Sequence, residues 1–583
     1  IRGYISTNNF KGMLGYILKT SGLNVEFKKV ELEGFGKLRI DDLKVKDQSG
    51  NIVIDAKKAT AKINLMLPSR LSKIEVSDAT VNLDRYPQNK FNVFNILKPD
   101  DKKKVTYDNT NRLGKLYFYN SVLNYTDTSY EKKIAKTLKN VNGYLEVSKS
   151  RGFSLEAKGS DGDESIKVFL DQKVNTLQSF KSMFDRTKNT DPKKKEFHLG
   201  FEFKNVNVTE SLGQYVPLDM IKAKKGVLTG NLELTQKHKE SVMKVKGKLD
   251  IKNGTIQYDD FDGDIENVDA VIDMKNDDIT VDAKTSIENH PVTFKMNYSI
   301  PKQNVNIKLT TDNVPFKEIA RYKVIKDFNV NASGNVTGEL DAAVNVQSKK
   351  FTLDGKFSSP QITLANYRFR DLKTSLKMSK EQILTLENTT FHFDETINGF
   401  KVKNDVLVPK FTYNVKEKQG NGNYILTNRG SDYSVARITG EASINKENIV
   451  TGNFNSNELS GNYVINTKEQ QMNINATGKE DLTVNYGGNS YDVNPKINNL
   501  VLKFDNKNIL QSGNIQAKLK SRNNKYFDLI NADINVRNGS YNVNADVNAK
   551  GQNLRVSGTT TADMRHSYKI KTTEKGRIDV AKL

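Results

Sequence analysis

The sequence predicts a mostly β protein, an elongated array of repeating antiparallel β-sheet units with a few short helices. Three observations predict this fold class. Apolar and polar residues alternate with a period of two over long stretches, as they do on a strand with one buried face. The links between these stretches are short, which favours antiparallel hairpins over crossover helices. Several landmarks also recur at a fixed spacing.

Residues 226–310 show the alternation most clearly, with Lys, Asp, Asn and Thr between the apolar positions. The Asn253-Gly254 step predicts a type I′ hairpin turn, because both residues tolerate a positive φ. The apolar face needs a cover, which is a second sheet in a sandwich, the same sheet closed on itself, or a bound apolar ligand. The apolar positions chosen on this face are Leu249, Ile251, Ile256, Tyr258, Ile272, Met274, Ile279, Val281, Val292, Phe294, Met296, Tyr298, Ile300, Val305, Ile307 and Leu309.

The landmarks that recur 108 residues later define an internal repeat. They are Gly226 and Gly334, Gly230 and Gly338, Gly247 and Gly355, and Phe261 and Phe369. We therefore predict one repeat at residues 205–312 and a second at 313–420, followed by a further β-groove region at 421–583. A short helix is expected before Pro217, with its counterpart at 316–322.

The N-terminal part is expected to contain two helical segments. An apolar stripe at helical spacing, from Phe10 to Leu18, predicts an amphipathic helix within residues 1–24. This helix would lie on a membrane or plug the end of the sheet. Residues 25–204 read as strands, with a helical insertion at about 163–195. The chain begins at Ile1 rather than Met, so we expect a membrane anchor before it.

Composition narrows the classes of function. The 583 residues include no Cys, which excludes disulfides, thiol chemistry and Cys-based metal sites. The net charge of +21 is spread along the strands as Lys-x-Lys, which suits a solvated face or anionic lipid headgroups. No nucleic-acid-binding motif accompanies it, so we expect no nucleic-acid partner. No run of 18 apolar residues marks a transmembrane helix.

The sequence shows no constellation typical of catalysis. Its five histidines are scattered without paired spacing, and no nucleotide-binding or nucleophile-elbow motif occurs in the right context. An acidic cluster at residues 259–266 reads as a solvated turn or a calcium site, although Gly263 is misplaced for an EF-hand loop. We therefore expect no enzyme activity, no cofactor and no metal.

Several segments together resemble the AsmA-like/TamB family of Gram-negative envelope proteins. These segments are GFGKLRIDDLKVKD, IEVSDATVNLDR, KFNVFNIL, FYNSVLNYTD followed by LKNVNGYLEV, and a short helix followed by GxxxG at 205–234 and 313–340. The resemblance covers most of residues 10–420.

The resemblance implies an elongated repeating antiparallel β-sheet curled into an apolar groove (a β-taco, or repeating β-groove), and the apolar positions named above for residues 249–309 are its predicted groove lining. It also implies a periplasmic, bridge-like lipid transfer protein. Such a protein carries phospholipid along its groove between the inner and outer membranes and serves outer-membrane biogenesis. It is anchored to the inner membrane, and an outer-membrane β-barrel is a further possible partner. The residues alone leave another reading open, a surface adhesin or scaffold of β-sandwiches or a β-solenoid with no lipid cargo.

Overall fold

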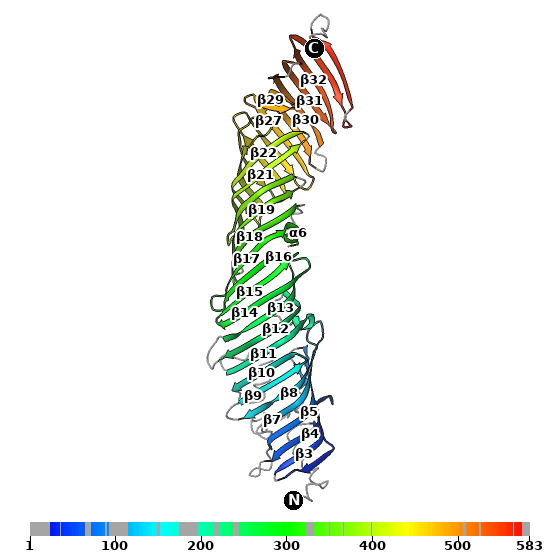
Figure 1. Cartoon of the computed structure of the whole chain (residues 1–583), viewed down its shortest axis with the longest axis vertical. Helices are drawn as coiled ribbons and strands as arrows, with labels where there is room; N and C mark the ends of the chain where they lie inside the picture. Colours follow the sequence, from blue (N-terminus) through cyan, green and yellow to red (C-terminus); the bar gives the residue numbers. More distant parts are fainter. Residues whose placement is uncertain are drawn as a thin grey trace. The chain divides into compact units, whose positions relative to one another are not determined.

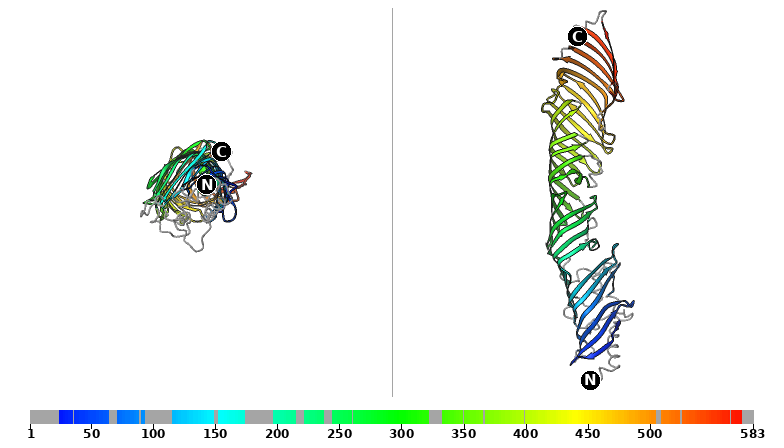
Figure 2. Two further views of the ribbon diagram at one scale, coloured as in Figure 1. Left: turned by 90° about the horizontal axis from the view of Figure 1, so that it is seen from below. Right: turned by 45° about the vertical axis from the view of Figure 1, so that its right-hand side comes forward.

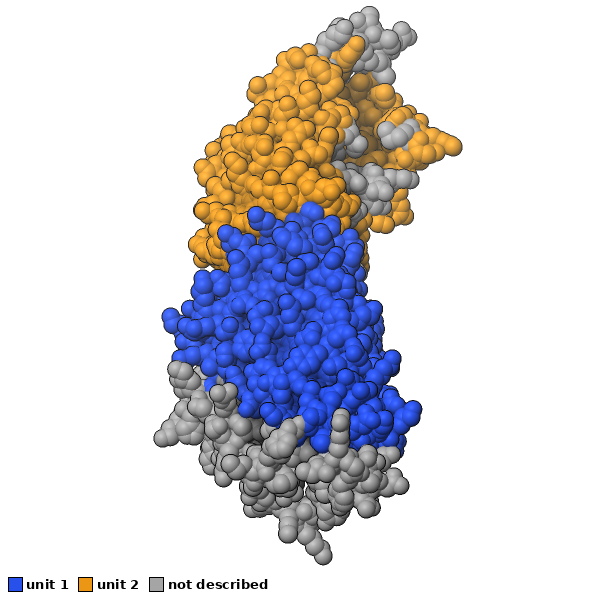
Figure 3. Space-filling model, turned by 60° about the horizontal axis from the view of Figure 1, so that its bottom comes forward, with its two compact units in different colours: residues 1–286, 295–302 blue, residues 287–294, 303–583 orange. Residues whose placement is uncertain are grey.

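The computed structural model describes residues 24–34, 36–63, 71–87, 90–92, 115–148, 152–173, 196–214, 221–236, 244–259, 261–321, 332–348, 350–364, 367–397, 399–504, 509–523, 526–563 and 565–573. It confirms the predicted fold class, because the described chain is almost all β and forms a long, open antiparallel sheet with two short helices. The chain divides into two compact units, residues 1–286 with 295–302 and residues 287–294 with 303–583 (Figure 3).

Unit 1 is a sheet whose strands follow one another mainly in chain order (Figure 1). Neighbours are antiparallel except β5 and β7, which pair in parallel. β1 and β2 both pair with β3. The elements are β1 (Asn24–Glu26), β2 (Lys29–Leu32), β3 (Lys37–Lys46), β4 (Ile52–Ile63), β5 (Leu71–Tyr86), β6 (Lys90–Phe91), β7 (Lys115–Asp127), β8 (Ile134–Ser148), β9 (Gly152–Asp161), β10 (Glu164–Lys173), β11 (Glu196–Thr209), α5 (Glu210–Gly213), β12 (Ile221–Gln236), β13 (Lys244–Tyr258), β14 (Asp264–Asn276) and β15 (Asp278–Ile287).

Unit 2 continues the same antiparallel pattern (Figure 2). Strand β16 (His290–Ser299) is divided, with residues 290–294 in unit 2 and 295–299 in unit 1. The other elements are β17 (Asn304–Pro315), α6 (Phe316–Ile319), β18 (Ala332–Asn345), β19 (Lys350–Leu364), β20 (Tyr367–Met378), β21 (Ile383–Ile397), β22 (Phe400–Asn414), β23 (Gln419–Asn428), β24 (Arg437–Ile444), β25 (Ile449–Asn455), β26 (Leu459–Asn466), β27 (Gln471–Gly478), β28 (Leu482–Tyr486), β29 (Asn489–Lys503), β30 (Ile509–Ser521), β31 (Leu529–Arg537), β32 (Ser540–Ala549), β33 (Gln552–Thr560) and β34 (His566–Thr572).

β-Bulges interrupt many of the long strands, and Asn or Asp occupies the left-handed position at several of them. Examples are Asn205, Asn253, Asn313, Asp371 and Asn499, with φ between 49° and 54°. The strand register shifts beside each of them. A bulge inserts one extra residue, bends its strand and increases the local twist. Asn and Asp adopt the left-handed region more readily than other side-chain-bearing residues. The bulges therefore mark where the strands bend as the sheet curls.

The internal repeat is visible in equivalent hydrogen bonds. The N–H of Asn205 donates to Thr229 Oγ1 at 3.1 Å, and the N–H of Asn313 donates to Thr337 Oγ1 at 2.8 Å. Helices α5 and α6 follow the strands that carry these bulges, which confirms the two short helices expected from the sequence. The domain boundaries predicted at residues 205, 313 and 421 are not tested by this recurrence and stay predictions.

Two local predictions are wrong. Asn253 and Gly254 do not form a hairpin turn, because they lie inside β13. Asn253 has the expected positive φ, but it forms a bulge whose N–H donates to Asp269 Oδ1 at 3.0 Å. The helical insertion cannot begin at about residue 163, because β10 pairs with β9 and β11. Alternating Ile166, Val168 and Leu170 explain this strand. The expected helices at 8–20 and 174–184 lie outside the described residues.

Candidate functional site: an apolar sheet face

The predicted groove residues lie on β13–β17, with Ile300 directly after β16. All are half-buried except Met274 and Val292, which are buried. Neighbouring positions along β15 and β17 alternate between exposed and half-buried over most of each strand. Within each unit the predicted residues therefore lie on one side of the sheet, which we call the apolar face of that unit, and most of their side chains keep part of their surface accessible.

Strand register gathers these residues into rows across each unit. In unit 1, Ile272 lies opposite both Leu249 and Val281, and Met274 lies opposite Ile279. In unit 2, Leu309 lies opposite Leu340. Directly paired residues have Cβ atoms about 4.5–5.5 Å apart, so side chains within a row touch. The apolar face is therefore continuous across β13–β15 in unit 1 and across β17 and β18 in unit 2.

The opposite face is polar and carries ion pairs between strands. Lys252 Nζ lies 3.2 Å from Asp269 Oδ2, and Lys308 Nζ lies 3.1 Å from Glu339 Oε2. The hydrogen bond to Glu339 raises the pKa of Lys308 above its usual value. These lysines are about half exposed, so their pairs contribute little stability. On these strands the positive charge belongs to a solvated polar face.

One carboxylate of the acidic cluster at residues 259–266 is paired with a lysine. Asp264 Oδ1 lies 2.7 Å from Lys224 Nζ on β12, so a lysine neutralises it. Phe261 is buried within the same turn. Among the residues that the structure describes, no group of three or more His, Asp or Glu side chains is placed to hold a metal ion.

The sequence interpretation missed an aromatic cluster on β23–β26, which belongs to the apolar face of unit 2. Tyr424 lies opposite Gly440, Tyr463 opposite Gly452, and Phe454 opposite Gly461. The outer atoms of each ring occupy the space that a Cβ on the glycine would need. The rings therefore lie flat across the neighbouring strand. The signal was a glycine two residues before an aromatic residue in GNY and GNF, and its meaning depends on register.

The hydroxyl groups of this aromatic cluster are satisfied within the sheet. Tyr424 donates to the carbonyl oxygen of Asn453 at 2.9 Å. Burial raises the pKa of Tyr424, and a hydrogen bond with Tyr463 raises it further. Burial also raises the pKa of Tyr463. Both phenols are therefore neutral at physiological pH, and the apolar face carries no charge there.

The comparisons with known proteins add no relative. No protein-family model, curated protein or solved structure matches this chain. In the described part of the chain, no helix combines the length and apolar character needed to cross a membrane.

Proposed function

We propose that this protein is a bridge-like lipid transfer protein. Phospholipid acyl chains lie along the apolar face, and their headgroups project to solvent at the polar rim. The observation that carries the proposal is the half-buried state of the residues lining β13–β17. A lipid tail would remove the remaining apolar surface from water, at about 25 cal/mol for each Å² covered.

The chemistry of the face supports a passive role. Its lining combines Leu, Ile and Val with Phe, Met and Tyr and offers few polar groups that could hold one cargo molecule in a fixed position. An apolar surface without directional partners permits sliding, because hydrophobic contact is non-directional. Movement along the face is therefore diffusive in this proposal, and the gradient of lipid between the two ends sets its direction.

The cellular setting belongs to the same proposal and rests on the resemblance to the AsmA-like/TamB family. The protein works in the periplasm, is anchored to the inner membrane, and delivers phospholipid for outer-membrane biogenesis. An outer-membrane β-barrel is the partner proposed at the receiving end. Fractionation of the full-length protein tests the anchor, and recovery in the soluble pool would contradict it.

Solvent extraction of the purified protein followed by mass spectrometry tests the cargo. We expect phospholipid to co-purify and to decrease when the apolar face is made polar by Phe294→Asp. The matched control is Asn297→Asp, which places the same carboxylate on the exposed side of the same strand. A lipid-free protein with a fully protected apolar face would support a closed scaffold instead.

A further inference from the structure

In unit 2 the two halves of the sheet between β22 and β29 contain different numbers of strands. On one half, β23–β27 lie between them in order, which makes six pairing steps. On the other half, residues 429–436 and β28 complete the path in three steps. At about 4.8 Å per step, the two paths span roughly 29 Å and 14 Å. The sheet must therefore bend towards the shorter path.

Backbone hydrogen bonds place residues 429–436, which we call the strap, between β22 and β28. The N–H of Asp432 donates to the carbonyl oxygen of Lys401 at 2.8 Å. The N–H of Ser434 donates to the carbonyl oxygen of Thr483 at 2.8 Å, and that of Asn485 donates to Asp432 at 2.7 Å. The strap thus occupies the place of a strand between β22 and β28, but only a few backbone hydrogen bonds hold it there.

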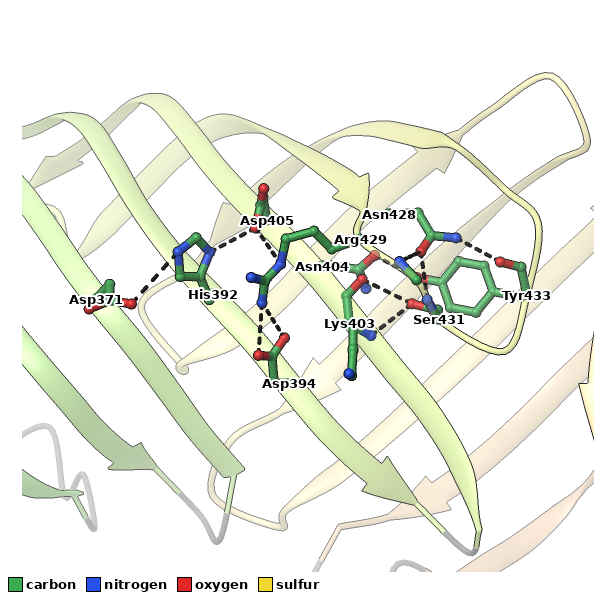
Figure 4. Close-up of polar contacts among 11 residues, drawn as sticks. Asp371, His392, Asp394, Lys403, Asn404, Asp405, Asn428, Arg429, Ser431 and Tyr433 are labelled. Carbon is green, nitrogen blue, oxygen red and sulfur yellow. Dashed lines mark hydrogen bonds and ion pairs between the residues drawn. The ribbon is translucent and has the colours of Figure 1, made fainter.

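Arg429 holds the strap on the polar face of the sheet (Figure 4). Its Nη2 lies 2.6 and 2.8 Å from the two carboxylate oxygens of Asp394, and its Nε lies 2.9 Å from Asp405 Oδ1. The Asp394 hydrogen bond raises the pKa of Arg429 above its usual value. Asp405 also contacts His392 Nδ1 at 2.7 Å, and His392 Nε2 lies 3.7 Å from Asp371. The guanidinium therefore joins β21 and β22 to the strap.

Tyr433 and Val435 hold the strap on the apolar face. The Tyr433 ring stacks on Phe400 with centroids 6.3 Å apart, and its hydroxyl donates to Asn404 Oδ1 at 2.7 Å. Val435 is 2% exposed. The side-chain amide of Asn428 donates to the carbonyl oxygens of Tyr433 and Val435 (Figure 4). The strap therefore lies in the sheet between β22 and β28, with Arg429 on the polar face and Tyr433 and Val435 on the apolar face.

We propose that the strap seals the apolar face where the sheet splits, and that Arg429 is the positioning residue that keeps it closed. Without the strap, the backbone groups of Lys401, Thr483 and Asn485 that bond to it lose their partners and become accessible to water. The Arg429 side chain is 39% exposed, so its removal opens the anchor without burying an unpaired charge in a dry core. The sealing of the apolar face rests on the proposed lipid cargo. The attachment of the strap to the sheet by Arg429 does not depend on that cargo.

Hydrogen exchange tests closure directly. In Arg429→Ala, the amides of Asp432, Ser434 and Asn485 should exchange roughly fivefold faster or more. The variant loses the contacts of Arg429 with two carboxylates, so the strap opens more often. Amides of β17 should keep their wild-type rates. Asp394→Asn should give a smaller change of the same kind. The matched control is Arg437→Ala, an exposed arginine at the start of β24. Unchanged exchange in Arg429→Ala would overturn the proposal.

Photo-cross-linking tests the sealing role. Cross-linking residues are placed on the apolar face at Leu309 in β17 and at Ile497 in β29. In Arg429→Ala, the phospholipid adduct at Leu309 should persist and that at Ile497 should fall severalfold. Equal adducts at both positions in the variant would overturn the sealing role. Adducts at neither position in the wild-type protein would contradict the proposed function, while hydrogen exchange would still decide whether Arg429 closes the strap.

Discussion

The core of β2–β5 and the apolar face of β13–β17 share one alternating pattern but differ in exposure. In β3 and β4, Leu38, Ala56 and Ala59 are 0% exposed and belong to one packed cluster. On β13–β17 most of the apolar side chains are larger and remain half-buried. Small alanine side chains let neighbouring groups pack closely against the sheet. A face of large side chains is uneven, so more of its surface stays accessible to solvent. Alternation identifies the apolar face, and side-chain size helps to distinguish a covered face from an uncovered one.

The largest expected effect is in the covered region. Leu38→Asp places a carboxylate where no water reaches, which costs several kcal/mol. We expect β2–β5 to lose their cooperative structure, and hydrogen exchange of the β3 and β4 amides measures this loss. If those amides stay protected, the two regions do not differ in the way described.

A smaller loss is expected where flat rings cover glycines. In Gly440→Val the new side chain overlaps Asn453 and the ring of Tyr424, so the ring must move. Overpacking of this kind costs about 1–3 kcal/mol. Ala442→Val, on the same face of β24, should cost less. Thermal melts compare the two variants. Equal melting temperatures would show that the position of the Tyr424 ring does not require a glycine at residue 440.

Phe294→Asp should affect stability less than either change. The side chain is half-buried, so the loss is about 1 kcal/mol rather than the larger cost of a dry site. The lipid adduct and function in vivo should nevertheless be lost, because a charge lies across the path of the acyl chains. Met296→Asp should behave alike. Unfolding of both variants, together with no lipid on the wild-type protein, would indicate a closed core.

The smallest effect is a pH dependence near Glu164. Burial raises its pKa, but hydrogen bonds from Lys136 and Asn207 outweigh burial and leave the pKa below its usual value. The carboxylate thus contributes stability above its unfolded-state pKa, and this contribution is lost as the pH falls through the folded-state pKa. Urea titrations from pH 6 down to pH 3 should show this loss, and Glu164→Gln should flatten it. If the free energy of unfolding of the variant falls with pH as steeply as that of the wild-type protein, Glu164 is not the source of the pH dependence.

The sequence predicts the strands well because period-two alternation depends only on local chain geometry. The apolar positions of β13–β17 follow from it, since a strand has two faces, but their role as a groove lining stays a prediction. The Asn253-Gly254 step was misread because positive φ serves both a hairpin turn and a bulge, and only the pairing partner distinguishes them. The strap was invisible because Arg429, Asp394 and Asp405 come from three segments that meet only in the folded sheet.

A photo-cross-linking scan along β16 tests the central claim most directly. A cross-linking residue is placed in turn at Phe294, Lys295, Met296 and Asn297, which alternate between the half-buried and exposed sides. We predict phospholipid adducts at Phe294 and Met296 and none at Lys295 and Asn297. Adducts without this alternation, or none at any of the four positions, would contradict a lipid-carrying apolar face.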